Sequence, residues 1–175
     1  GFSYSVKFIM KAAAAGRISG VCGSIAQLIS VPDEYSTAVE TALGGALQNI
    51  AVENEDGAKR AIRLLKEAKA GRATFLPLTS VNGRLLNDAP QGEFGYVALA
   101  AELVSCDERY KGLIRSLLGR VAVAEDIDAA SAIARKYGYR FKIVTLDGQV
   151  VNAGGSYTGG SVSKSAGILT RKNEI

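Results

Sequence analysis

The sequence predicts a mixed α/β protein, built from two similar α/β subdomains and flanked at each end by a short coiled-coil stub. Three observations carry this prediction. The chain of 175 residues is 47% hydrophobic and 22% charged, which is typical of a chain that folds around a core. Its central part contains an internal repeat. Apolar residues near both ends follow heptad-like spacings, whereas no apolar run approaches the ~18 residues of a membrane span.

Residues 1–15 predict the first helix, an N-terminal coiled-coil arm stub. Its apolar residues recur at spacings of four, three and four, the a/d rhythm of a coiled coil: Phe2, Val6, Ile9 and Ala13. An amphipathic helix that caps the domain would show the same spacing. Residues 166–175 predict the C-terminal stub, in which Ile168 and Ile175 lie seven residues apart. With one methionine and a start at Gly1, the chain is expected to be a domain inserted into a longer coiled coil.

The internal repeat aligns residues 20–44 with residues 95–119 without a gap, and seven of the 25 positions are identical. The identical pairs are Gly20/Gly95, Ala26/Ala101, Leu28/Leu103, Ser30/Ser105, Tyr35/Tyr110, Leu43/Leu118 and Gly44/Gly119. The repeat predicts subdomain I over about 16–80 and subdomain II over about 95–165. Between them, residues 81–94 lie in a stretch rich in Gly, Asn, Asp and Pro, as a linker does.

Each copy predicts the same order of elements. A short strand leads to an acidic turn, and then to a helix with apolar residues at i, i+3, i+4, i+7 and i+8. The predicted elements are helices from Tyr35 to Leu43 and from Tyr110 to Leu118, strands at 49–52 and 120–124, helices after Asn54 and Asp126, and strands at 73–76 and 142–145. Residues 143–151 predict a hairpin that turns at Asp147-Gly148.

The hairpin leads directly into a glycine-rich segment, NAGGSYTGGSVSK, at residues 152–164. A phosphate-binding loop of the Walker A type would need glycines where the chain has Thr158 and Ser163, so that motif is absent. A flexible linker is disfavoured because a strand enters the segment. Glycines after an edge strand indicate close approach by another backbone, here that of a second copy of the chain.

Catalytic and metal chemistry find little support in the sequence. There is no histidine, and Cys22 and Cys106 are far apart, so neither His-based catalysis nor the usual zinc ligand sets are available. Acidic groups at 53–56 and 125–128 precede predicted helices, where carboxylates favour the positive end of the helix dipole. We expect no enzyme activity, no catalytic residue, no metal and no cofactor.

Basic residues gather at the two ends of the chain, whose net charge is +4. Residues 1–20 contain Lys7, Lys11 and Arg17 and no acid, and the last 15 residues contain Lys164, Arg171 and Lys172 against a single acid. Such ends can neutralise phosphates, although a solvated charged surface explains them equally well.

Taken together, three stretches resemble the hinge domain of bacterial structural maintenance of chromosomes (SMC) proteins. They are ALGGALQNI, AGRATFLPL and VTLDGQVVNAGGSYTGGSVSK, and the similarity extends over about residues 16–165. The chain departs from the family pattern at Ala153, where proline is frequent, and at Tyr157, where methionine is frequent. Residues 92–104 are also less typical of the family than the first subdomain is.

The resemblance implies a hinge over residues 16–165 that dimerises as a two-fold ring and joins two coiled-coil arms. The resemblance further implies that these arms lead to a distant ATPase head with accessory condensin subunits, in a cytoplasmic, nucleoid-associated protein of chromosome condensation, segregation, DNA replication and repair. The implied dimer interface is Gly154, Gly155, Ser156, Thr158, Gly159 and Gly160. The implied non-specific contacts to double- or single-stranded DNA are Lys164, Arg171, Lys172, Lys7, Lys11 and Arg17.

Two other classes of function remain open from the sequence. One is a small-molecule- or nucleotide-binding α/β domain that uses the glycine-rich segment as a phosphate site. The other is a nucleic-acid-binding module in which dimerisation is incidental. A screen with nucleotides would identify the first, and DNA affinity that survives in a monomeric variant would identify the second.

Overall fold

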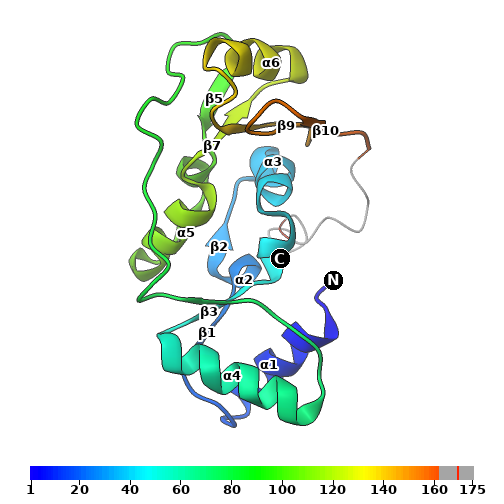
Figure 1. Cartoon of the computed structure of the whole chain (residues 1–175), viewed down its shortest axis with the longest axis vertical. Helices are drawn as coiled ribbons and strands as arrows, with labels where there is room; N and C mark the ends of the chain where they lie inside the picture. Colours follow the sequence, from blue (N-terminus) through cyan, green and yellow to red (C-terminus); the bar gives the residue numbers. More distant parts are fainter. Residues whose placement is uncertain (162–168, 170–175) are drawn as a thin grey trace.

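The two copies of the repeat share the order of their main strands and helices, and the mixed α/β prediction is confirmed. The computed structural model describes residues 1–161 and Leu169. Helix α1 (Tyr4–Ala14) comes first (Figure 1). The first copy comprises β1 (Val21–Ser24), α2 (Ile25–Leu28), β2 (Ile29–Ser30), α3 (Asp33–Leu43), η1 (Gly44–Gln48), β3 (Ile50–Val52), α4 (Glu55–Ala68) and β4 (Phe75–Pro77). The second comprises β5 (Tyr96–Leu99), η2 (Ala100–Leu103), β6 (Ser105–Cys106), η3 (Glu108–Tyr110), α5 (Lys111–Leu118), β7 (Val121–Ala124), α6 (Ile127–Lys136), β8 (Lys142–Thr145), β9 (Val150–Val151) and β10 (Tyr157–Thr158).

The strands pair in the same way in each copy. In the first, β3 pairs antiparallel with β1 and parallel with β4; in the second, β7 pairs antiparallel with β5 and parallel with β8. The second sheet continues through β9 to β10, so that its order is β10-β9-β8-β7-β5. The two copies meet through β2 and β6, where Ser30 lies opposite Ser105. These two serines occupy the same position of the repeat, so equivalent strands join the copies.

Side-chain caps start the helices at equivalent positions of the two copies. The Asn54 carboxamide oxygen accepts a hydrogen bond from the Gly57 N–H (3.0 Å) and opens α4. The Asp126 carboxylate accepts from the Ala129 N–H (2.9 Å) and opens α6. Each cap satisfies an amide that the helix itself leaves without a partner. Asn54 and Asp126 are therefore the local reason why both helices begin directly after a buried strand.

Three apolar clusters hold these elements together. The central cluster lies between α3, α5 and one face of the second sheet, and it includes Val123 and Val144. The opposite face of that sheet, with Ala122 and Ile143, packs under α6 in the second cluster. Successive strand residues thus enter different clusters, as the two-residue period of a strand requires. The third cluster lies between the first sheet and the helices α1 and α4.

Helix α1 packs on the first subdomain through the stripe that the sequence predicts, with one change. Val6, Ile9 and Ala12 are buried, whereas Ala13 is only half-buried. Phe2 packs against two of the apolar clusters. It stays a prediction that coiled-coil arms begin at residues 1–15 and 166–175, and the subdomain boundaries stay predictions as well. Of residues 166–175, only Leu169 is described.

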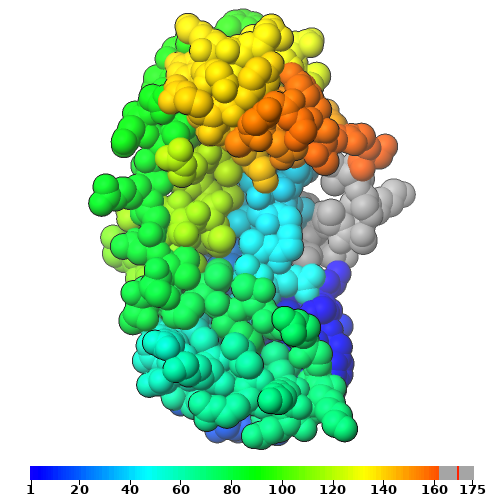
Figure 2. Space-filling model, viewed as in Figure 1, coloured from blue at the N-terminus to red at the C-terminus, as the bar shows by residue number. Residues whose placement is uncertain are grey.

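The linker at 81–94 is docked along the second subdomain (green in Figures 1 and 2). Gly83 N–H donates to the Gly112 carbonyl (3.0 Å), and Leu86 N–H donates to the Gly119 carbonyl (2.9 Å). A Cβ at Gly83 would lie 2.3 Å from the Ser116 Cα, so this close approach requires glycine. Among the described residues, no helix is long and apolar enough to cross a membrane.

Candidate dimer edge and basic surface

The first half of the glycine-rich segment forms a hairpin at the edge of the second sheet. Among the described residues, strand β10 pairs only with β9, with Tyr157 opposite Val151 and Thr158 opposite Val150. The Asn152 N–H donates to the Ser156 carbonyl (2.7 Å), and the Gly155 N–H donates to the Asn152 carbonyl (3.0 Å). The Asn152 side chain also donates to Thr158 Oγ1 (3.1 Å). These bonds close a tight turn and leave β10 as an exposed outer strand.

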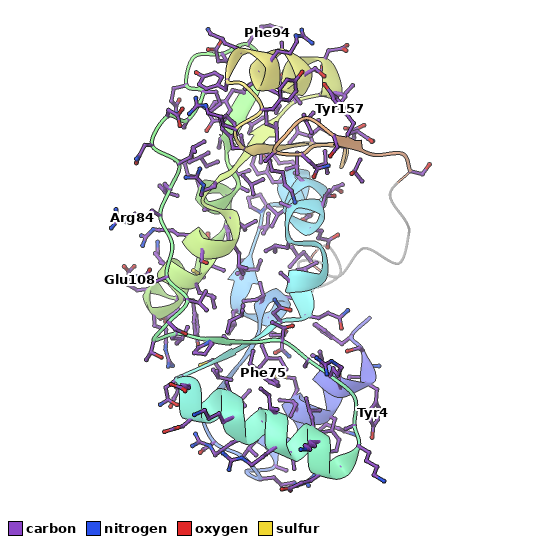
Figure 3. All side chains as sticks on the ribbon, viewed as in Figure 1. Tyr4, Phe75, Arg84, Phe94, Glu108 and Tyr157 are labelled. Atoms are coloured by element: carbon purple, nitrogen blue, oxygen red, sulfur yellow. The ribbon has the colours of Figure 1, made fainter. Side chains whose placement is uncertain are left out.

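Contacts with the preceding loop and with α6 anchor the hairpin to the body of the subdomain. The Gly154 N–H donates to the Tyr139 carbonyl (2.8 Å). The Tyr157 hydroxyl hydrogen-bonds the Ser131 hydroxyl (2.7 Å), although half of the residue Tyr157 (51%) is exposed. Figure 3 shows Tyr157 at this outer edge. The edge is therefore held in place from both sides of the turn.

Contacts and backbone angles within one chain explain the four glycines of the segment in different ways. Gly154, Gly155 and Gly160 have φ of 90°, 106° and 134°, in the region that favours glycine. A Cβ at Gly154 or Gly160 would meet nothing within 4 Å, so those positions have space outside the fold. At Gly159, a Cβ would lie 2.1 Å from Gln149 Oε1. Close contact with a second chain is thus not needed to explain Gly159.

Strand β10 presents main-chain groups that can pair with another strand. The bond between Asn152 and Ser156 flanks the pair Tyr157 and Val151, which makes it a non-hydrogen-bonded pair of the antiparallel ladder. The N–H and C=O of Tyr157 consequently point away from β9. By the same alternation, those of Gly159 point outward as well. An outer strand of this kind is a template for strand addition.

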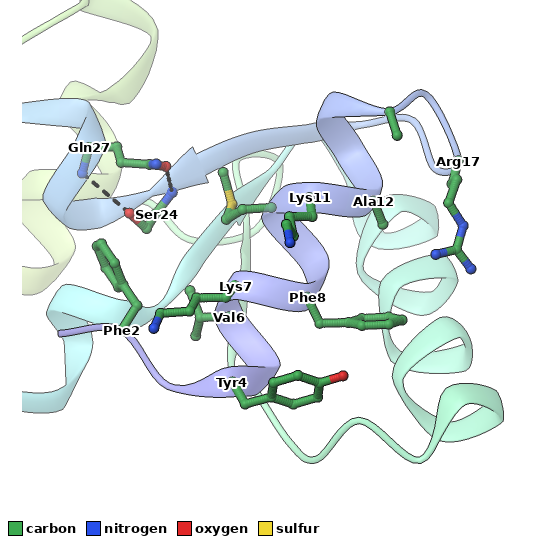
Figure 4. A pocket seen from close by; sticks show the side chains of 12 residues that line it. Phe2, Tyr4, Val6, Lys7, Phe8, Lys11, Ala12, Arg17, Ser24 and Gln27 are labelled. Carbon is green, nitrogen blue, oxygen red and sulfur yellow. Dashed lines mark hydrogen bonds between the residues drawn. The ribbon is translucent and has the colours of Figure 1, made fainter.

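A basic groove runs along α1, at the other end of the molecule from the hairpin (Figure 1). The groove has a volume of about 710 Å³, and Lys7, Lys11 and Arg17 line it together with apolar side chains (Figure 4). All three basic residues are exposed. The Arg17 guanidinium lies 5.7 Å from the centre of the Phe8 ring, which restricts its position by a cation–π contact. The structure thus brings together the three N-terminal candidates for phosphate contact.

Two further arginines extend the basic surface and were not predicted from the sequence. Arg60 and Arg63 of α4 line a second hollow with Arg17 and with the acidic Glu67. The Arg60 guanidinium donates to the Ser19 carbonyl (3.3 Å) and so ties α4 to the loop after α1. Their helical spacing of three places both on one face of α4. Only the fold reveals that this face borders the loop after α1.

Three of the predicted DNA contacts, Lys164, Arg171 and Lys172, lie outside the described residues. Within residues 1–161 and Leu169, no three or more Cys, Asp or Glu side chains gather in a group that could hold a metal ion. Cys22 and Cys106 are free and half-buried, and burial raises the pKa of both thiols. Raised thiol pKa values lower the fraction of reactive thiolate at neutral pH.

The fold of two pseudo-equivalent α/β units with an open outer strand is shared with a known class of chromosomal proteins. The family model of the flexible hinge domain of SMC proteins matches residues 18–134. The chain is 40% identical over 180 residues to the chromosome partition protein Smc of Bacillus subtilis, with all of this chain and 15% of that protein covered. The chain belongs to the family of SMC hinge domains.

Solved structures show the same relationship. The hinge domain of Geobacillus stearothermophilus SMC, crystallised as an asymmetric dimer, matches with a TM-score of 0.92 and 43% identity, over 99% of this chain and 71% of that one. The Pyrococcus furiosus SMC hinge matches with a TM-score of 0.76 and 28% identity, over 91% of this chain and 81% of that one. Because the chain spans only about 15% of the curated relatives' length, the properties of a whole SMC protein are proposals for it.

Proposed function

We propose that this hinge domain forms a two-fold homodimer and that β10 is part of the contact. The exposed outer strand carries the proposal, because it offers main-chain donors and acceptors on a rigid support. The interface is proposed to include Gly154, Gly155, Ser156, Thr158, Gly159 and Gly160. The similar Geobacillus hinge crystallised as a dimer, which supports the dimeric state itself. A symmetric pairing would use the same patches on both copies.

We further propose that the basic surface around α1 binds DNA phosphates without reading sequence. Lys7, Lys11 and Arg17 line one groove, and no acidic residue lies in the first 20 positions of the chain. Lys164, Arg171 and Lys172 are proposed to contribute from the other end of the chain. Contacts of this kind release counterions, so the affinity should fall steeply with salt.

In the whole protein, the hinge is proposed to join two coiled-coil arms that lead to an ATPase head. The similarity to chromosome partition proteins supports a role in chromosome condensation and segregation, in the cytoplasm and at the nucleoid, with accessory subunits at the heads. The hinge itself is proposed to carry no catalytic site. The first part of its glycine-rich segment folds as a hairpin that ends with β10 at Thr158, which favours a role in pairing over the alternative of a phosphate-binding loop.

The molar mass in solution tests the dimer. We expect twice the chain mass for the native protein and a shift toward the single-chain mass for the double variant Gly154→Ala/Gly155→Ala. Gly92→Ala is the matched control, because Gly92 also has a positive φ (82°) and open space at its Cβ, but lies in the linker. A monomeric native protein, or a double variant as dimeric as Gly92→Ala, would contradict the proposal.

A further inference from the structure

The pairing of β9 with β10 breaks off where the side chain of Gln149 enters the ladder. Continuing the register of Thr158 opposite Val150 would set Gly160 opposite Gly148. The main chain of Gly148 is turned elsewhere, since its N–H donates to the Thr145 carbonyl (3.0 Å) in the β8–β9 turn. Gly160 therefore cannot find its usual partner on the neighbouring strand.

The Gln149 carboxamide takes the place of that missing partner. The Gly160 N–H donates to Gln149 Oε1 (2.8 Å), and Gln149 Nε2 donates to the Gly160 carbonyl (3.0 Å). A carboxamide carries the same donor and acceptor as a peptide group, so it can satisfy both main-chain groups of one residue. The two bonds continue the pairing of the outer strand for two residues beyond Thr158.

Asp147 determines which way the carboxamide faces. Its carboxylate accepts a hydrogen bond from Gln149 Nε2 (3.3 Å) and another from the Thr145 hydroxyl (2.5 Å). An ionised carboxylate can only accept, so the NH₂ end of the carboxamide must face it. The Thr145 hydroxyl lowers the pKa of Asp147, which keeps that carboxylate ionised at neutral pH. Asp147 thereby leaves Gln149 Oε1 directed at the Gly160 N–H.

We propose that Gln149 is a positioning residue of the dimer contact: its side chain acts as a surrogate strand segment that holds residues 159–160 in an extended form, ready to pair with a second copy of this chain. Gly159 is glycine because the carboxamide crosses beside it, where a Cβ would lie 2.1 Å from Oε1. The outward N–H and C=O of Gly159 then join those of Tyr157 in one docking edge. This inference rests on the proposed dimer through β10.

A cycle of variants measured for dimer dissociation tests the proposal. Gln149→Ala removes two hydrogen bonds to Gly160, so we expect about a tenfold weaker dimer and faster amide hydrogen exchange at Gly160. Gly159→Ala should weaken the dimer similarly by displacing the carboxamide. In the double variant, Gly159→Ala should cost nothing further, because the group it displaces is gone. If the losses of dimer affinity in the two single variants add up in the double variant, the proposal is overturned. Gly159 would then be glycine because a side chain there would collide with the partner chain.

A conservative variant separates positioning from general stability. Gln149→Glu keeps the length of the side chain but cannot donate to the Gly160 carbonyl while ionised. We expect it to weaken the dimer at pH 7 and to recover affinity toward pH 4, where a protonated carboxyl can donate again. Unchanged dissociation in Gln149→Ala and Gln149→Glu would refute the role of Gln149, whereas a native protein that is monomeric would refute the underlying dimer.

Discussion

The Glu40 carboxylate accepts a hydrogen bond of 2.6 Å from the main-chain N–H of Leu169, across 129 positions of the chain. Both residues are buried, with exposed fractions of 8% for Glu40 and 1% for Leu169. Leu169 belongs to the central apolar cluster together with residues of α3 and α5. The end of the chain is thus fixed at Leu169 to a helix of the first copy.

Removing either partner of this contact should destabilise the hinge. For Leu169→Ala we expect a loss of about 2–4 kcal/mol in the free energy of unfolding, because a buried side chain is lost and a cavity remains. For Glu40→Ala we expect about 1–3 kcal/mol, since a buried amide loses its acceptor. Urea unfolding measures both. Glu34→Ala, at an exposed position in the first turn of the same helix, should cost at most about 1 kcal/mol through the helix dipole. A loss there equal to that of Glu40→Ala would disprove the role of Glu40.

The outward N–H of Tyr157 gives a direct test of strand pairing between copies. Tyr157→Pro removes that donor, which no strand within residues 1–161 uses, while Tyr157→Ala removes the side chain alone. We expect a dimer at least fivefold weaker for Tyr157→Pro than for Tyr157→Ala, by analogy with the loss of one to two hydrogen bonds. Sedimentation at several concentrations measures both. Equal dissociation constants would mean that this edge does not pair.

Charge reversal on α1 tests DNA binding separately from dimerisation. Lys7→Glu and Lys11→Glu should each lower the affinity for duplex DNA and reduce the slope of log affinity against log salt by about one unit per lost phosphate contact. Arg120→Glu makes the same charge change at an exposed site outside the groove and serves as the control. Equal effects of the three variants would indicate attraction by net charge only. The molar mass should be unaffected throughout.

Alkaline pH should destabilise the fold through Tyr96. Burial, with a smaller effect of the Glu102 carboxylate, raises the pKa of Tyr96 to about 12. The phenol is ionised near pH 10 in the unfolded chain. The contribution of neutral Tyr96 is therefore complete below pH 10 and is lost between pH 10 and 12, because the unfolded chain releases the proton first.

The variant Tyr96→Phe should not show the part of the alkaline loss of folding stability that comes from ionisation of Tyr96. Within the described residues, the Tyr96 hydroxyl is buried without a hydrogen-bond partner, so the variant should be at least as stable as the native protein at pH 7. Urea unfolding between pH 7 and 11 measures both effects. An unchanged pH slope, or a large loss of stability at pH 7, would contradict the burial of a neutral phenol.

The internal repeat allowed most of the fold to be predicted from local patterns. Helix periodicity, together with the capping residues Asn54 and Asp126, places α4 and α6 correctly, and the Asp147-Gly148 turn places the β8–β9 hairpin. Contacts between distant segments could not be predicted in this way. The docking of Leu86 on the Gly119 carbonyl depends on how the linker runs along the second subdomain, which no local periodicity encodes.

The location of the candidate dimer edge was predicted from the sequence, but the contacts that explain its glycines were not. The sequence indicates that the glycines follow an edge strand, and the fold has that strand as β10. It does not reveal that Gly159 gives room to Gln149, because that contact depends on the hairpin register. The register observed in the structure, with Asn152 opposite Ser156, is what sets Gln149 opposite Gly159 three residues further along each strand.

The equivalent glycines that begin the two copies should differ in their tolerance of alanine. Gly20 and Gly95 have similar φ (84° and 80°). Their carbonyls accept equivalent hydrogen bonds from the main-chain N–H groups of Glu53 (2.9 Å) and Glu125 (2.8 Å). A Cβ at Gly20 would lie 3.0 Å from the flexible end of Arg60, whereas at Gly95 it would lie 2.4 Å from the buried Ala129 Cβ.

We therefore expect Gly95→Ala to cost about 1–3 kcal/mol more in the free energy of unfolding than Gly20→Ala, because both strain the backbone but only Gly95→Ala also overpacks a helix against its sheet. Chemical unfolding of the two variants gives this difference. Adding Ala129→Gly to Gly95→Ala removes the overlapping methyl group, although glycine within α6 itself costs about 1 kcal/mol. Measured against Ala129→Gly alone, the remaining cost of Gly95→Ala should fall to that of Gly20→Ala. If it stays at its original value, overlap with Ala129 is not the cause, and the equivalent positions differ for another reason.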